Sequence, residues 1–138
     1  MKLKKLVFFA LLLFASNSFA QNTVTQINTG DGVHYITTNI NYPITGTYLF
    51  EGTAPIVVLN ANGTGVFQGH DQAEKEMVWG IECEQNGTPK AIIDADSAAY
   101  SLWYKNTVGS DQNWDSVPFS IQFTTSKMYI QGERMKSY

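Results

Sequence analysis

The segment from Glu76 to Cys83 constrains the fold more than any other part of the chain. Apolar side chains occupy every second position in it: Met77, Trp79, Ile81 and Cys83. Successive side chains of a β-strand point to opposite faces, so this period of two predicts a strand with one buried face. Glu82 belongs to the opposite face and is expected to point to solvent.

Similar short runs of β-forming residues recur along the chain, with turn residues between them. After the first twenty residues, no window shows the i, i+3, i+4, i+7 spacing of an amphipathic helix. The expected strands cover residues 23–27, 33–42, 45–51, 56–60, 64–69, 76–83, 89–95, 99–106, 117–123 and 127–134. No β–α–β pattern is present, which predicts an antiparallel sheet. Eight strands in a meander suffice to close a barrel, and closure removes exposed edges.

Three short connections predict hairpins. Asn62-Gly63 and Asn86-Gly87 readily adopt the positive φ angles of tight turns, so each is expected to join two antiparallel strands. The segment 124–126 is equally short and is expected to join the last two strands, 117–123 and 127–134.

The first twenty residues have the features of an export signal. Three lysines precede the apolar run from Leu6 to Ala15, which is too short to span a bilayer, and small residues Ser18 and Ala20 follow. We expect cleavage after Ala20 and a secreted or periplasmic mature protein, with a retained membrane anchor as the alternative. Residues 21–43 are then an N-terminal extension or extra strands, and residues 44–138 are the barrel domain.

The mature chain would carry six basic and twelve acidic residues, a net charge of −6. Nucleic acids and anionic membranes are bound through clustered Lys and Arg, so this balance argues against both as partners. Cys83 is the only cysteine and lies on the apolar face of its strand, which predicts a buried and unreactive thiol.

The acidic loop that begins at His70 is the strongest candidate for metal or acid–base chemistry. His70, Asp71, Glu74 and Glu76 lie close together in it. However, the chain has no recognised spacing of metal ligands, no nucleophile elbow and no phosphate-binding glycine loop. The sequence therefore predicts no catalytic residues, no metal and no cofactor.

A resemblance to the calycin group of lipocalin-like small barrels follows from the strand pattern and from two short signatures. In that group a Gly-x-Trp motif opens the first barrel strand, and a late Arg packs over the aromatic ring and closes the barrel. Gly46-Thr47-Tyr48 and Arg134 occupy those places here, with Tyr48 in place of Trp. The resemblance covers residues 44–138 and implies a barrel closed by Gly46, Tyr48 and Arg134.

Two further resemblances concern shorter segments. Residues 59–67 match the L-x-x-x-G-x-G-x-F pattern of small exported lipocalin-like bacterial proteins, many of which have no assigned activity. The segments ITGTY and WYKN, together with Trp114, resemble avidin-like barrels. Those proteins line a biotin pocket with several tryptophans, whereas this chain has three tryptophans in all.

Aromatic residues are numerous, and inward-pointing aromatics of a barrel either line a ligand cavity or fill the interior. The first interpretation predicts a non-enzymatic carrier of a small apolar or amphipathic ligand, with a site formed by Tyr48, Met77, Trp79, Ile81, Phe119 and Ile121. The second predicts a structural or protein-interaction module, with a protein partner or a homodimer. An enzyme or inhibitor acting through its loops is the third interpretation.

Several strands, including 99–106, carry apolar residues on both faces. Because the outside of a barrel should be polar, part of it must be covered by the N-terminal segment or by a partner chain.

Overall fold

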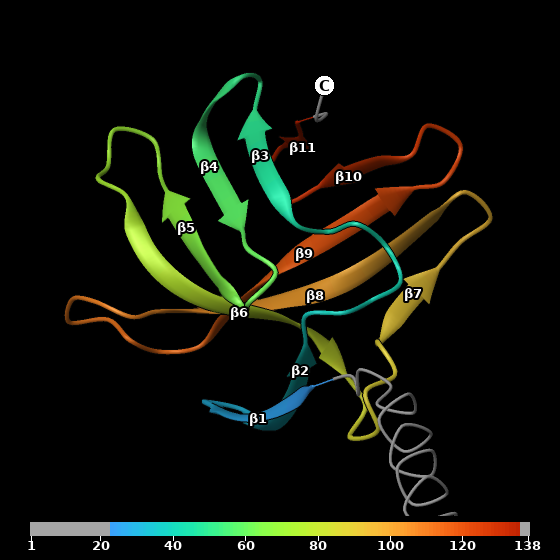
Figure 1. Ribbon diagram of the computed structural model, residues 1–138, viewed down its shortest axis with the longest axis horizontal. Helices are drawn as coiled ribbons and strands as arrows, with labels where there is room; N and C mark the ends of the chain where they lie inside the picture. Colours follow the sequence, from blue (N-terminus) through green and yellow to red (C-terminus); the bar gives the residue numbers. More distant parts are fainter. Residues whose placement is uncertain (1–22, 136–138) are drawn as a thin grey trace, which may run out of the picture.

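The computed structural model describes residues 23–135, and within that range it contains eleven β-strands and no helix (Figure 1). In chain order the strands are β1 (Val24–Thr29), β2 (Gly32–Thr37), β3 (Gly46–Phe50), β4 (Thr53–Leu59), β5 (Thr64–Gln68), β6 (Lys75–Cys83), β7 (Ala91–Ile93), β8 (Ser97–Asn106), β9 (Asp115–Gln122), β10 (Lys127–Tyr129) and β11 (Glu133–Arg134). The predicted signal segment lies outside the described residues.

Eight of these strands close into an antiparallel barrel, which confirms the predicted fold class. The neighbours run β6-β5-β4-β3-β11-β10-β9-β8, and β8 pairs with β6 to complete the circle. Adjacent strands along the chain pair with one another in most of this circle, because short turns bring them side by side. The hairpin predicted at Asn62-Gly63 joins β4 to β5, and Gly63 adopts a φ of 85°.

One face of each barrel strand fills the interior. The largest completely buried side chains include Trp79, Tyr48 and Phe119, each no more than 2% exposed. Met77, Ile81, Leu102 and Ile121 pack in the same cluster, together with Ile40 and Ile44 from the segment that precedes β3. The alternation between Glu76 and Cys83 therefore places the predicted apolar face inside the barrel.

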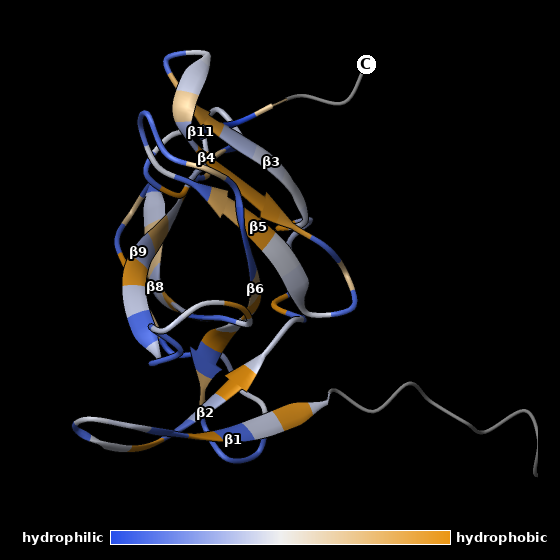
Figure 2. Ribbon diagram, turned by 90° about the vertical axis from the view of Figure 1, so that its left-hand side faces the viewer, coloured by the Kyte–Doolittle hydropathy of each residue, from blue (hydrophilic) through white to orange (hydrophobic). Residues whose placement is uncertain are grey.

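The β1–β2 hairpin lies outside the barrel, below the ring of strands in Figure 2. β2 pairs with the C-terminal half of β6, and the inner face of the hairpin covers the outer face of the barrel there. Ile27 and Ile36 form a second small core with Trp103 of β8, and Trp114 packs against it. The N-terminal hairpin therefore covers the outward apolar face expected for the strand 99–106.

Gly80 makes this close packing of the hairpin possible. A Cβ atom at this position would lie 2.7 Å from both Cβ and Cδ1 of Ile36. The hairpin also changes the surroundings of Glu82, which the strand pattern placed in solvent. The Glu82 side chain is only 15% exposed, because His34 and Trp103 lie against it.

Two predicted strand boundaries are wrong. The expected strand 33–42 ends at Thr37. The expected strand 127–134 is interrupted after Tyr129, and Gln131, with a φ of 57°, turns the chain back so that Tyr129 pairs with Glu133. Asn41, with a φ of 62°, and Gln131 lie inside the two expected strands, and a positive φ is incompatible with an extended backbone.

The predicted Asn86-Gly87 hairpin forms over a short stretch: Glu84 N–H donates to the Thr88 oxygen (2.8 Å), Lys90 N–H donates to the Glu82 oxygen (3.0 Å), and a bridge joins Cys83 to Pro89. Beyond this hairpin, β7 pairs with β8.

Candidate functional site

The barrel interior was the predicted ligand site, and the structure shows it to be filled. The hollow detected among the interior side chains measures about 10 Å³, which is the size of a single water molecule. The predicted ligand-binding residues Tyr48, Met77, Trp79, Ile81, Phe119 and Ile121 are each 3% exposed or less. They therefore pack against one another, and of the six only Met77 borders this small hollow.

The polar atoms of the interior aromatics are also engaged. Tyr48 donates a hydrogen bond from its hydroxyl to the backbone oxygen of Ile44 (2.5 Å), and its ring meets Phe119 edge to face. Trp79 donates from Nε1 to the backbone oxygen of Thr64 (2.9 Å). Burial raises the pKa of the Tyr48 hydroxyl far above its ordinary value, so it stays protonated and remains a donor.

The three residues predicted to close the barrel lie together. Arg134 is the register partner of Tyr48, and its Nε donates a hydrogen bond to the backbone oxygen of Thr45 (2.8 Å). The guanidinium crosses Gly46, where a Cβ atom would be 3.0 Å from Arg134 Nε. Gly46 has a φ of 131°, so both its backbone conformation and this contact favour glycine.

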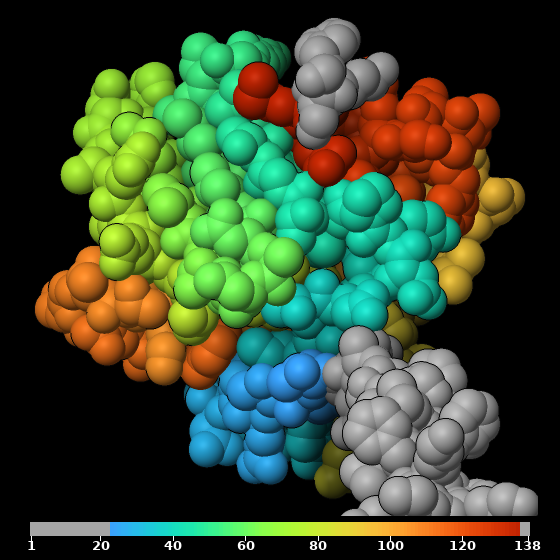
Figure 3. Space-filling model, in the orientation of Figure 1, coloured from blue at the N-terminus to red at the C-terminus, as the bar shows by residue number. Residues whose placement is uncertain are grey.

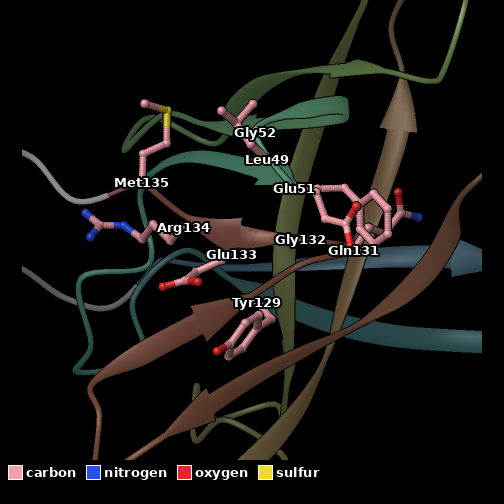
Figure 4. Close-up of a pocket in the computed structure, with 10 residues that line it drawn as sticks. Leu49, Glu51, Gly52, Tyr129, Gln131, Gly132, Glu133, Arg134 and Met135 are labelled. Atoms are coloured by element: carbon pink, nitrogen blue, oxygen red, sulfur yellow. The ribbon is translucent and has the colours of Figure 1, made fainter.

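A much larger hollow lies on the outer face of the barrel, where β3 and β11 pair with each other (Figure 4). We call it the seam cleft. It has a volume of about 850 Å³ and is lined by Leu49, Phe50, Glu51, Gly52, Tyr129, Gln131, Gly132, Glu133, Arg134 and Met135. In Figure 3 the β3–β4 segment and the β10–β11 segment border each other at this end of the molecule.

Two tight turns form the walls of the seam cleft. Glu51 and Gly52 connect β3 to β4 with φ angles of 48° and 79°, and the β3–β4 register shifts beside them at Leu49 and Phe50. The opposite wall is the turn between β10 and β11. A Cβ atom on Gly132 would overlap the backbone of Leu49 and Phe50, so only glycine lets this turn rest directly on β3.

The lining of the seam cleft is mainly apolar, with acidic groups at its edge. Phe50 and Met135 are about half exposed, at 47% and 52%. Glu133 forms an ion pair with Lys127 (3.4 Å), and the exposed carboxylate of Glu51 lies on the other wall. This arrangement can hold an apolar body and place a hydrogen-bond donor or a positive charge beside carboxylates.

Sequence reasoning missed this cleft for a physical reason. Glu133 and Met135 contribute to it only because the chain reverses at Gln131, and an uninterrupted final strand would not produce that wall. The available local signal was Gly52, a turn-forming residue between two β-forming runs.

The acidic loop around His70 does not form a metal site. His70 and Asp71 make an exposed pair with Nε2 and Oδ2 3.3 Å apart. Within residues 23–135, no group of three His, Cys, Asp or Glu side chains is arranged to hold a metal ion. Likewise, that part of the chain contains no helix long and apolar enough to cross a membrane.

Comparison of the chain with protein-family models, with curated proteins and with solved structures finds no match.

Proposed function

We propose that this chain is an exported, non-enzymatic binding protein that holds a small amphipathic ligand in the seam cleft. The observation that carries the proposal is the contrast between a filled interior and a large, mainly apolar cleft on the outer face of the same barrel. The proposal keeps the ligand class expected from the sequence and moves the site from the barrel interior to the seam.

The chemistry of the cleft indicates which amphipathic molecules it favours. Apolar pockets with a few polar groups at defined positions bind ligands by burying apolar surface and orienting a polar end. The charged groups beside the apolar lining are the carboxylates of Glu51 and Glu133 and the guanidinium of Arg134, whose Nε already donates to the backbone oxygen of Thr45. Carboxylates outnumber cations in this lining. A ligand with an ammonium or another hydrogen-bond donor at one end is therefore favoured over an anion, since a like charge would be repelled.

Native mass spectrometry of the protein purified from its own host is the first test. A bound species of a few hundred daltons that is lost on denaturation is expected, and its composition would identify the ligand class. The intact mass of the denatured chain tests export, because a cleaved signal leaves a chain that begins at Gln21, with or without loss of ammonia from that residue.

The site itself can be tested with two soluble probes that share one alkyl chain: dodecylammonium and dodecyl sulfate, each below its micelle concentration. Dodecylammonium is expected to bind more tightly. Phe50→Ala removes a half-exposed ring from the cleft and should weaken binding roughly tenfold, equivalent to about 1.4 kcal/mol. Phe123→Ala is the matched control, because Phe123 is 36% exposed and lies outside the cleft.

Equal loss in both phenylalanine variants would mean that the probe binds elsewhere. A stronger affinity for dodecyl sulfate would contradict the role given to the two carboxylates.

A protein-interaction module is the second candidate, favoured by β7. All three residues of β7 are exposed, with Ile92 at 76% and Ile93 at 71%, and β7 pairs with β8 alone among the described strands. An open strand edge with apolar side chains is a surface on which another chain can add a strand. If β7 mediates self-association, light scattering should detect a dimer that Ile92→Lys abolishes and Val33→Lys, at an exposed site on the hairpin, preserves.

A further inference from the structure

Charged side chains from two parts of the chain meet where β2 of the hairpin pairs with the C-terminal half of β6. Nδ1 of His34 is 2.6 Å from Oε1 of Glu82, and Nε2 of His34 is 2.9 Å from Oδ1 of Asp31. The His34 and Glu82 side chains are 19% and 15% exposed, whereas Asp31 is 71% exposed. Glu82 belongs to the barrel, and the other two residues belong to the hairpin.

The geometry at His34 favours the protonated ring. A neutral imidazole has one N–H and one nitrogen with a lone pair, and only the imidazolium donates from both nitrogens. Both nitrogens of His34 face carboxylate oxygens within hydrogen-bond distance, so a neutral ring would direct a lone pair at one of the two carboxylates. The hydrogen bond to Glu82 is the largest influence that raises the pKa of His34 above its ordinary value of 6.5, with Asp31 adding to it and burial opposing it.

We propose that His34 is a pH-sensitive latch that holds the β1–β2 hairpin against the barrel. The protonated ring makes a charge-assisted hydrogen bond from the hairpin to Glu82 of β6. When the ring releases one proton to water, the tautomer with hydrogen on Nδ1 keeps a weaker bond to Glu82, and the bond to Asp31 is lost.

The other groups around the latch determine how far it opens. Lys90 Nζ lies 3.7 Å from Glu82 Oε1, and Trp103 donates from Nε1 to Glu82 Oε2 (3.4 Å). The Trp103 ring also lies beside the His34 ring, with centroids 4.7 Å apart. Glu82 therefore keeps partners when His34 becomes neutral, and the apolar contacts of Ile27 and Ile36 remain. Deprotonation loosens the hairpin without releasing it outright.

The direction of the pH effect follows from the raised pKa. A group that binds its proton more tightly in the folded state stabilises that state fully below its unfolded pKa, here 6.5. That stabilisation is lost as the pH rises through the folded pKa. The hairpin should therefore open more often in mildly alkaline than in mildly acidic solution, and each opening exposes Ile27, Ile36 and Trp103.

The test combines two measurements on the intact mature protein. A nuclear magnetic resonance titration of both histidine rings should give His34 a higher pKa than 6.5. Hydrogen exchange of the β1–β2 amides, corrected for the intrinsic pH dependence of exchange, should show protection that falls between pH 6 and pH 9. The fall should be roughly tenfold for each unit by which the measured pKa of His34 exceeds 6.5.

The second histidine provides a matched control. His70→Gln alters an exposed side chain whose contact is Asp71, and it should leave the pH dependence of hairpin exchange intact. His34→Gln should abolish that dependence. The proposal is overturned if His34 titrates at or below 6.5, or if hairpin protection falls equally in wild type and His34→Gln. No residue of this cluster lines the seam cleft, so failure of the ligand-binding proposal would leave this one standing.

Discussion

Replacing Gly80 with alanine tests how the hairpin is seated on the barrel. The new Cβ atom would lie 2.7 Å from Cβ and Cδ1 of Ile36 and 2.9 Å from its Cγ1. Carbon atoms in favourable contact are about 3.5–4.0 Å apart, so the overlap is about 1 Å. Rotation of the Ile36 side chain cannot relieve it fully, because the Cβ of Ile36 is attached to the β2 backbone. The hairpin itself must move.

Two estimates bound the loss of stability expected for Gly80→Ala. Overpacking a fitted contact costs about 1–3 kcal/mol. Detachment of the hairpin would instead lose the burial of Ile27 and Ile36, at about 1.5–3 kcal/mol for each side chain. The protein relaxes by whichever route costs less, so we expect Gly80→Ala to lower the free energy of unfolding by about 1–3 kcal/mol. This corresponds to a fall in Tm of about 4 °C for each kcal/mol.

Urea unfolding followed by tryptophan fluorescence measures this loss, and hydrogen exchange shows whether the β1–β2 amides lose protection first. Gly30→Ala is the control, because nothing lies within 4 Å of a Cβ atom built there. It carries the same change in unfolded-chain entropy without the overlap. If the two variants unfold at the same urea concentration, the hairpin is not seated on Gly80 and the reasoning fails.

Two further predictions concern buried groups. Tyr48→Phe removes the donor that satisfies the Ile44 carbonyl, so urea unfolding should show a free energy of unfolding lower by about 1–3 kcal/mol. The control Tyr104→Phe, at a ring that stacks on Phe67, should lower it much less. Equal losses would refute a special role for this hydrogen bond. The Cys83 thiol is 1% exposed, and burial raises its pKa. A colorimetric thiol reagent at pH 8 should therefore label it only after unfolding. Rapid labelling of the native protein would contradict its placement in the core.

The sequence by itself determined the features that depend on neighbouring residues. The alternation of Met77, Trp79, Ile81 and Cys83 identified an inward face because a strand repeats every two residues, whatever lies beside it. Asn62-Gly63 identified a turn because glycine adopts positive φ without steric cost. Repeated short strands without helical spacing were enough to predict an antiparallel barrel.

The tertiary structure alone decided which strands meet and what their faces enclose. Whether aromatic side chains fill a barrel or line a cavity depends on how their volumes fit together, and no spacing along the chain encodes that fit. The seam cleft requires the reversal at Gln131 against β3. The contact between His34 and Glu82 joins residues 48 positions apart, and it removes from solvent a carboxylate that the local pattern exposed. Packing and electrostatics between distant segments decide such features, and local periodicity carries no information about either.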